Sequence, residues 1–382
     1  MTKGFWRGKL LLLCFVPWLA LQGQETPPPD QTVDTEGPQA RKYSNEFLKI
    51  GVSARAFGMG NAQTAIAEDV SGGYWNPAAL AHEEALMYPE LALMHASYFA
   101  NIASYNWIGF TMPVDSAGNR RFGATLIRFG IDDIPNTLQL VEPDGQINYD
   151  RIQSFSVSDL AVIMSYAWRP QQVPGLHLGV NMKIIYRGIG RFANAWGFGL
   201  DVGAHYQRDR FRAGLVLMDA TNTINAWTFN TETFAQAFIA TGNEIPENSL
   251  ELTRPTIRLG LAYDFRLGRR MSLLASLDND IFTDGQRPFA LLSVGDFTLD
   301  PRAGLELAYL NAQYRKVAFL RAGAYNLQNV VNNDAEEALG LFPTAGVGVV
   351  IRNFQLDYAL ANIGNFSENL HSHVVSLRFH IQ

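Results

Sequence analysis

Residues 47–80 read FLKIGVSARAFGMGNAQTAIAEDVSGGYWNPAAL, the stretch of the chain that is densest in glycine, alanine and isolated polar residues. Small residues allow backbone and short helices to pack closely against a wall, and glycine permits the positive φ angles of tight turns. The stretch is a poor hydrophobic core in its own right. We therefore predict a compact plug, or hatch, over residues 46–85 that folds inside a larger structure.

Two other interpretations of this stretch are a dinucleotide-binding loop and a helical cap. Gly58 and Gly60 match part of the glycine fingerprint of a dinucleotide-binding loop, but Gln63 occupies the position of the third glycine. No strand–helix–strand pattern with a following acidic residue surrounds them, which disfavours this interpretation. A helical cap packed on a sheet is the other alternative, and it leaves the prediction for the rest of the chain unchanged.

The composition indicates β structure, as in a membrane barrel. The chain has 382 residues, 33 of them glycine, with 12% aromatic and 17% charged residues. Soluble domains carry roughly 25% charged residues, and no apolar run beyond the N-terminus reaches the roughly 18 residues of a membrane-spanning helix. The net charge of −6, without a basic patch, predicts no binding to nucleic acid.

The N-terminus has the pattern of a secretory signal peptide over residues 1–23. Basic residues precede an apolar run from Leu10 to Leu21, and the small Gly23 is a plausible cleavage site. Cys14 lies within this run, so we expect a mature protein without disulfide or thiol chemistry. Residues 24–45 are rich in proline and poor in apolar residues, which predicts a disordered periplasmic tail.

Residues 86–382 show the period-2 alternation of β-strands. Apolar residues alternate with small or polar ones in 176–186, 196–206, 257–265, 354–360 and 375–381. The small and polar face carries many glycines, which the solvent face of a soluble sandwich would not explain. Aromatic residues stand near strand ends, where the interfacial girdles of a membrane barrel lie; they are Tyr186, Trp196, Tyr206 and Tyr309.

Connection lengths alternate along the chain, and this is the strongest sign of a membrane barrel. Outer-membrane barrels have an even number of antiparallel strands, short periplasmic turns and longer outer loops. We place short turns at 115–119, 169–174, 207–210, 267–270, 312–315 and 352–353. We place longer loops at 131–154, 220–254, 281–300, 327–342 and 362–371. The prediction is an all-β, about 14-stranded antiparallel outer-membrane barrel over 86–382, with both termini in the periplasm and the last strand closing the edge.

The polar face of the predicted strands carries charges that would point into the lumen. They could line a permeation path or pair with one another inside a plugged barrel, and the need of confined charges for partners favours pairing. The candidate lumen residues are Lys183, Asp201, His205, Arg258, Asp264, Glu306, Asp357 and Arg378.

The hatch sequence resembles the signature of the PorV/PorQ family, outer-membrane barrels related to the FadL-type channels for hydrophobic solutes. The resemblance rests on the residues of the hatch motif, which are Gly51, Ala54, Arg55, Gly58, Met59, Gly60, Asn61, Asp69, Trp75, Asn76 and Pro77. Residues 356–365 and 373–379 also resemble the closing hairpin of that family. The resemblance therefore covers both ends of the mature chain.

The resemblance implies a role in type IX protein secretion, in which such barrels contact the translocon and the C-terminal signal domains of secreted cargo. The contact would fall on the outer loops 131–154 and 220–254. The second loop is long enough to suggest a function, and its aromatic residues Trp227, Phe229, Phe234 and Phe238 are candidates for a partner surface. Alternatively, these aromatic side chains fold down and cap the barrel mouth.

A FadL-type channel for hydrophobic small molecules is the alternative function. There the N-terminal segment acts as a hatch in the lumen, and a lipid or fatty-acid ligand passes through a kink or opening in the wall. A purely structural barrel is a third possibility. In each case the chain would contact outer-membrane lipid.

The sequence lacks the motifs of common enzymes, such as a Gly-x-Ser-x-Gly elbow, a phosphate loop or His-Glu-x-x-His. We therefore predict no enzymatic activity and no cofactor. His371 and His373 could chelate a metal, but they lack a nearby carboxylate or thiol partner. Asp278 and Asp280 with Asp284 faintly resemble a calcium loop without its glycine and glutamate. We expect both groups to be ordinary polar residues.

Overall fold

The computed structural model describes residues 39–40, 43–82, 88–98, 101–140, 142, 145–235, 238–239, 242–288, 290–331, 337–361 and 372–381. Residues 38–382 form one compact unit, separate from residues 1–37. The predicted signal peptide, most of the predicted tail, Cys14 and the loop 362–371 with His371 lie outside the described residues. No helix within the described part is long and apolar enough to cross a membrane.

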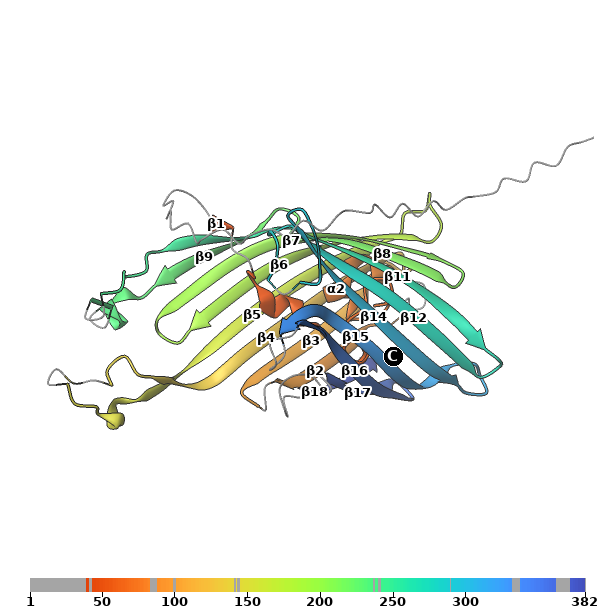
Figure 1. Ribbon diagram of the computed structural model, residues 1–382. Coiled ribbons are helices and arrows are strands. Elements are labelled where there is room, and N and C mark those ends of the chain that lie inside the picture. The colour runs from red at the N-terminus through yellow and green to blue at the C-terminus, as the bar shows by residue number, and fades with distance from the viewer. Residues whose placement is uncertain are drawn as a thin grey trace, which may run out of the picture. The chain divides into compact units, whose positions relative to one another are not determined.

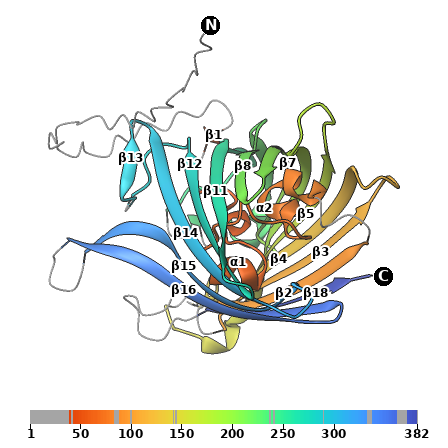
Figure 2. The ribbon, with the colours of Figure 1, turned by 90° about the vertical axis from the view of Figure 1, so that its right-hand side faces the viewer.

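Fourteen antiparallel strands form a closed barrel wall (Figures 1 and 2), which confirms the predicted fold class. The last strand pairs with the first from His373 beside Ser97 to His380 beside Glu90, which leaves the wall without a free edge. The wall strands are β2 (Glu90–Tyr98), β3 (Ala103–Pro113), β4 (Arg120–Asn136), β5 (Gln153–Trp168), β6 (Leu176–Ile189), β7 (Ala193–Arg208), β8 (Phe211–Met218), β11 (Thr256–Leu267), β12 (Met271–Phe282), β14 (Phe297–Leu310), β15 (Lys316–Val331), β16 (Glu337–Ile351), β17 (Phe354–Ala361) and β18 (Ser372–His380).

The wall turns its apolar side chains outward and its polar ones inward. On β6, Val180 and Ile184 are exposed, whereas Asn181 and Lys183 between them are buried. On β7, Trp196 and Phe198 are exposed and Asp201 is buried. A water-soluble sandwich shows the opposite arrangement, whereas a strand between lipid and a filled lumen shows this one.

The two ends of the barrel differ in their connections. The short-turn end carries the connections of two to seven residues after β3, β5, β7, β11, β14 and β16. The long-loop end carries the connections after β4, β8 and β12. Those after β4 and β8 project as extended hairpins (Figure 1). The C-terminal Ile381 lies at the short-turn end, where its N–H donates to the carbonyl of Pro89.

The structure corrects the predicted long loops, which contain more strand than expected. The predicted loop 220–254 includes β9 (Thr223–Phe229) and β10 (Ser249–Thr253), which extend β8 and β11 toward the long-loop end. The predicted loop 281–300 includes β13 (Leu292–Val294). Strands β4, β5, β15 and β16 also run into the predicted loops 131–154 and 327–342. Backbone groups beyond the apolar band still need partners, so pairing continues where Thr and Asn replace apolar residues.

Two local interruptions separate these extensions from the wall strands. Asp219 and Asn222 adopt positive φ angles of 53° and 56° between β8 and β9. Pro255 stands between β10 and β11 and cannot donate to the ladder. Strand β7 nevertheless pairs with both β8 and β9, so the wall stays continuous around the break.

The N-terminal segment enters the barrel at the long-loop end. Strand β1 (Gln39–Ala40) pairs in parallel with β10, and the side chains of Ser44 and Asn45 hydrogen-bond to Thr253. The chain then runs through the lumen and reaches the short-turn end, where Arg169 donates to the carbonyl of Ala81. Residue 43 and Ile381 therefore lie at opposite ends of the barrel. The location of both termini in the periplasm stays a prediction, because residues 1–38 are not described.

Candidate functional site

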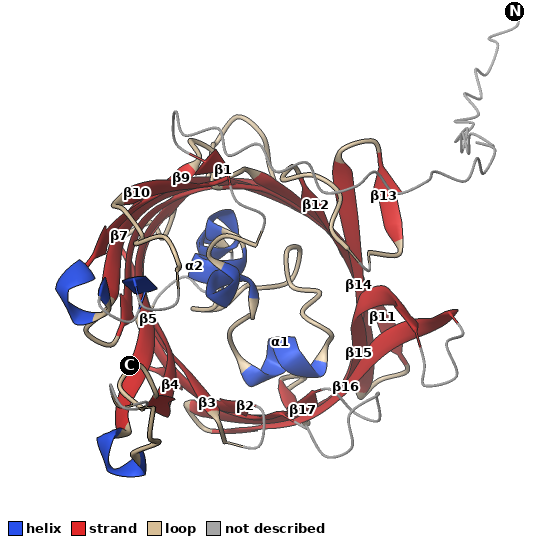
Figure 3. Cartoon of the chain, turned by 60° about the vertical axis from the view of Figure 1, so that its left-hand side comes forward, coloured by secondary structure: helices blue, strands red, loops and turns tan. Residues whose placement is uncertain are grey.

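Residues 46–82 fill the lumen as a series of short helices and turns (Figure 3). The helical pieces are η1 (Glu46–Lys49), α1 (Ala54–Gly58), α2 (Gly72–Trp75) and η2 (Pro77–Ala81). Nearly all of these residues are buried, including Phe57 and Trp75. Gly51 and Gly60 have φ angles of 109° and 59°, which side chains with a Cβ adopt at a cost. We call residues 46–82 the hatch.

A belt of wall glycines receives the hatch. A Cβ atom added at any of these glycines would lie between 2.2 and 3.0 Å from a hatch atom, closer than real Cβ contacts allow. For example, the backbone of Met59 and Gly60 occupies the space beside Gly304 and Gly323. The glycines follow the hatch over seven strands and are Gly179, Gly203, Gly214, Gly260, Gly304, Gly323 and Gly346. The inward glycines of the alternating sequence therefore make room for the hatch backbone.

Buried ion pairs fix the first half of the hatch to the wall. Arg55 donates to both carboxylate oxygens of Glu306, at 2.8 and 3.1 Å. Glu306 also accepts from Arg321, which in turn contacts Asp357 at 2.7 Å. Burial alone would lower the pKa of Arg55, but the Glu306 carboxylate outweighs it and raises that pKa. The motif arginine is therefore a charged anchor.

A second ion pair anchors the middle of the hatch. Asp69 lies 2.8 Å from Arg378 of β18 and caps the backbone N–H of Ser71. Burial would raise the pKa of Asp69, but Arg378 and Arg55 outweigh it, and the pKa lies below its usual value. The carboxylate is therefore ionised at neutral pH.

Hydrogen bonds complete the docking of the motif. Asp278 of β12 accepts from the N–H groups of Gln63 and Thr64 and from the Thr64 hydroxyl. The Asn76 amide donates to the carbonyls of Thr64 and of Ala204 in β7. The backbone N–H of Ala54 donates to Ser376, and Asn61 donates to the carbonyl of Ile50.

The remaining motif residues pack within the hatch or against the wall. The Trp75 indole donates to the carbonyl of Val52, and the Arg258 guanidinium lies 5.1 Å from its ring centroid. Pro77 fills the space beside Gly203, and Gly58 that beside Gly346.

The candidate lumen residues form separate clusters. Lys183 contacts Asp201 at 2.7 Å and also pairs with Asp219 at the break in the wall. Arg258 contacts Asp280 at 2.7 Å with both side chains buried. Asp264 is partly exposed and pairs with Lys316 at 3.2 Å. The Lys, Arg, Asp and Glu residues among the lumen candidates thus each have an ionic partner, and their role in the lumen stays a prediction.

His205 lies where the hatch meets the wall near the short-turn end. Its ring stacks on that of His177 at 5.5 Å, and its Nε2 donates to the Ala65 carbonyl at 3.0 Å. His82 packs edge-on against His177 and lies 3.6 Å from Glu68. The described residues contain no group of three or more side chains placed to ligate a metal ion.

The predicted loop 220–254 contains a strand that includes two of the candidate partner residues, and the partner role of these residues stays a prediction. Trp227 and Phe229 belong to strand β9, because their backbone pairs with β7 and β10. The Trp227 indole donates to Glu251, and its ring lies under Arg187. Phe234 is buried and packs against Phe192 and Phe238. These aromatic side chains make contacts within the protein at the long-loop end. This arrangement is close to the alternative in which they fold down and cap the barrel mouth.

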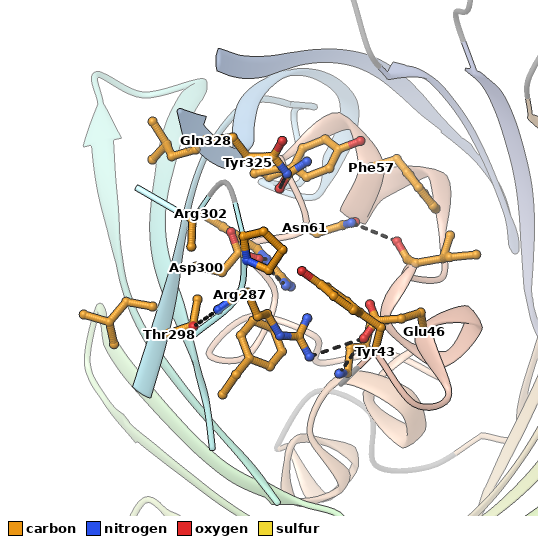
Figure 4. A pocket seen from close by; sticks show the side chains of 18 of the residues that line it. Tyr43, Glu46, Phe57, Asn61, Arg287, Thr298, Asp300, Arg302, Tyr325 and Gln328 are labelled. Atoms are coloured by element: carbon orange, nitrogen blue, oxygen red, sulfur yellow. Dashed lines mark hydrogen bonds and ion pairs between the residues drawn. The ribbon is translucent and has the colours of Figure 1, made fainter. Parts of the chain in front are cut away.

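A cavity of about 430 Å³ lies at the long-loop end between the hatch and strands β12, β14 and β15 (Figure 4). We call it the mouth cavity. Its aromatic lining consists of Tyr43, Phe57, Tyr98, Phe282 and Tyr325. Its charged lining consists of Glu46, Lys49, Arg287, Asp300 and Arg302.

The charges around the mouth cavity are paired. Arg287 contacts Asp284 at 2.7 Å and Glu46 at 3.3 Å, and its guanidinium lies 3.7 Å from the Phe282 ring centroid. Burial would raise the pKa of Asp284, but Arg287 lowers it below the usual value. The loop residue Arg287 thus ties the loop after β12 to the start of the hatch.

Of the residues that line the mouth cavity, only Asn61 was singled out from the sequence, as part of the hatch motif. Residues 284–302 were assigned to a predicted loop and the start of a strand, without a role. A sequence signal was available in Asp284 and Arg287, which are three residues apart and of opposite charge. Asp278 and Asp284 do not share a site, because Asp278 binds the hatch backbone and Asp284 binds Arg287.

The fold is similar to that of solved hydrocarbon channels. The toluene transporter TbuX of Ralstonia pickettii matches with a TM-score of 0.51 and 16% identity over 87% of this chain and 99% of its own. The toluene transporter TodX of Pseudomonas putida matches with a TM-score of 0.51 and 14% identity over 87% and 99%. The CymD monoaromatic hydrocarbon channel matches with a TM-score of 0.52 and 12% identity over 87% and 98%.

At these identities the likeness shows a shared fold. The sequence matches no protein-family model and no curated protein. These neighbours are named as transporters and a channel, and the lack of enzymatic activity stays a prediction for this chain. They give no support to the PorV/PorQ assignment or to the secretion role that it implied.

Proposed function

We propose that the protein is an outer-membrane channel for small hydrophobic molecules, which bind first in the mouth cavity. The observation that carries this proposal is the cavity itself. Its volume of about 430 Å³ falls in the range of roughly 300–1,000 Å³ that small-molecule sites occupy. Five aromatic side chains line it, and aromatic faces bind apolar rings and chains well.

Two further features support this function. The outward face of the wall is apolar, as contact with lipid requires. Neighbours with the same fold are toluene transporters and a monoaromatic hydrocarbon channel. Phe57 and Asn61 of the hatch line the cavity. A bound molecule can pass deeper into the barrel only if the hatch moves.

Ligand binding to the purified chain tests the proposal. We expect toluene to bind saturably at one site, and Tyr325→Ala to weaken that binding roughly tenfold because about 1.4 kcal/mol of aromatic contact is lost. Tyr309→Ala is the matched control, since Tyr309 is 44% exposed on the outer face of β14. Absence of saturable binding, or equal losses in both variants, would contradict the proposed function.

A further inference from the structure

A shallow apolar groove of about 340 Å³ lies on the outer face of the wall, across strands β6, β7, β8 and β11. Ala204 of β7 faces outward there, because Val202, two positions away on the same strand, is exposed. Ala213 of β8 faces outward in the same way beside the exposed Leu215. The small alanines leave a depression between larger side chains, which are Leu176, Tyr206, Leu215 and Leu261. We call this depression the wall groove.

Exposed arginines stand at the short-turn end of the wall groove. They belong to the turn between β7 and β8 and to the next turn along the rim, between β11 and β12. The one exposed carboxylate in these two turns is Asp209. Among the described residues none of these arginines pairs with a carboxylate, so the rim beside the groove carries a net positive charge. The arginines are Arg208, Arg210, Arg266, Arg269 and Arg270.

Strand pairing places the two turns side by side at the end of the groove. Arg208 lies two residues beyond Tyr206 on β7, so both side chains belong to the outward face. The carbonyl of Arg210 accepts from the N–H of Asp264 in β11 at 3.0 Å, two residues before Arg266. The arginines therefore begin about 7 Å beyond the apolar lining, at a rise of roughly 3.3 Å per residue.

Aromatic side chains mark the level at which the wall leaves the hydrocarbon. Phe211, Tyr263 and Phe265 are exposed on the outward face at the short-turn ends of β8 and β11. Aromatic residues gather at the interface of a membrane barrel, level with the lipid headgroups. The arginines adjoin this level, and a guanidinium binds a phosphate group through two parallel N–H donors. An acidic soluble protein would meet the arginines but not the groove, because the groove faces hydrocarbon.

A second groove on the outer face, of about 400 Å³, has no such charge beside it. It is lined by residues of β4 to β7, among them Met164, Tyr166 and Val180. The turn that joins β5 and β6, residues 169–175, is described throughout and contains no exposed cation. Its one arginine, Arg169, is partly buried and donates to the carbonyl of Ala81. The combination of groove and basic rim is therefore specific to the wall groove.

We propose that the wall groove is a binding site for an anionic phospholipid. One acyl chain lies in the groove, and the phosphate group lies on the arginines of the two turns. The site favours phosphatidylglycerol over zwitterionic phosphatidylethanolamine, because the net negative headgroup matches the positive rim. It lies on the outer face of the wall near the short-turn end, apart from the mouth cavity, so it does not depend on the transported molecule.

The lipid that is retained after extraction tests this selection. The full chain is reconstituted in bilayers of phosphatidylglycerol and phosphatidylethanolamine in equal parts and extracted with mild detergent. Native mass spectrometry then identifies the bound lipids. We expect phosphatidylglycerol to be retained roughly fivefold more often than phosphatidylethanolamine. Retention of the two lipids in equal amounts would overturn the inference, and it is the result expected if the arginines serve an acidic soluble protein instead.

A matched pair of double variants locates the phosphate contact. Arg208→Gln with Arg210→Gln removes two charges from the rim of the wall groove and should abolish the preference for phosphatidylglycerol. Arg128→Gln with Arg191→Gln removes two exposed arginines toward the long-loop end and should keep it. Equal preferences in the two double variants would overturn the inference.

Filling the wall groove tests the acyl-chain contact. Ala213→Trp occupies the groove without changing a charge, and we expect it to reduce the retained phosphatidylglycerol roughly fivefold because apolar contact is lost. Val180→Trp adds a side chain of the same size to the second groove and should leave retention unchanged. If Ala213→Trp does not fold, Ala204→Leu fills the same groove from β7 with a smaller side chain. Undiminished retention in the folded variant would overturn the inference.

Discussion

Nε of Arg55 in the hatch lies 2.8 Å from the carboxylate of Glu306 in the wall, with only 1% of the Glu306 side chain exposed. Arg55 of the hatch and Arg321 of β15 both donate to this carboxylate. The hatch is thus tied into the ionic network that also holds neighbouring wall strands. Its position depends on the same contacts that stabilise the wall.

Removing the hatch arginine should loosen the hatch without leaving Glu306 unpaired. We expect Arg55→Met to reduce the free energy of unfolding by about 2–3 kcal/mol, less than the roughly 3–5 kcal/mol for stranding a buried charge, because Arg321 still pairs with Glu306. The measurement is denaturant unfolding in detergent. Lys316→Met breaks the more exposed pair with Asp264 and should cost less than about 1 kcal/mol. Equal costs for the two variants would contradict the anchoring role of Arg55.

A methyl group added to a glycine of the belt should lower the free energy of unfolding of the barrel. We expect Gly323→Ala to cost about 1–3 kcal/mol, because its Cβ would lie 2.2 Å from the backbone nitrogen of Gly60. Gly188→Ala on β6 is the control, since the nearest atom to its Cβ lies at 3.4 Å. Unfolding midpoints and resistance of the hatch to proteolysis measure the effect. A Gly323→Ala barrel as stable and as resistant as the control would show that the hatch does not press against the wall there.

The Asp69–Arg378 pair predicts a pH-dependent stability. The folded-state pKa of Asp69 lies below its usual value of about 3.9, so its contribution is present above about pH 4 and is lost as the pH falls through the folded pKa. We expect Asp69→Asn to cost about 1.5–3 kcal/mol at neutral pH. The difference between wild type and variant should shrink as the pH falls below about 4 and through the folded-state pKa of Asp69, because the Asp69 side chain then becomes neutral like that of Asn. A difference that is independent of pH would contradict this assignment.

The sequence predicted the fold well because the determinants of a barrel are local. Alternation on β6 and β7 and the short turns between strands follow from neighbouring residues, and the hatch could be read from the small residues around Gly58 and Gly60. The assignment of 220–254 as a loop was wrong because Thr223 and Asn225 alternate with Ile224 too weakly to reveal β9. The mouth cavity could not be predicted, since it joins Asn61 to Arg302 across 241 positions, and only the strand register places them together.

Filling the mouth cavity tests the central claim most directly. Ala290 lines the cavity from the loop after β12, and Ala290→Trp would occupy the space without changing any charge. The measurement is the initial rate of uptake of labelled toluene by whole cells that carry the protein in their outer membrane. We expect saturable uptake with the wild-type chain and a reduction of roughly tenfold or more with Ala290→Trp at equal amounts of folded protein. Uptake by the Ala290→Trp cells equal to that of wild type would contradict the account.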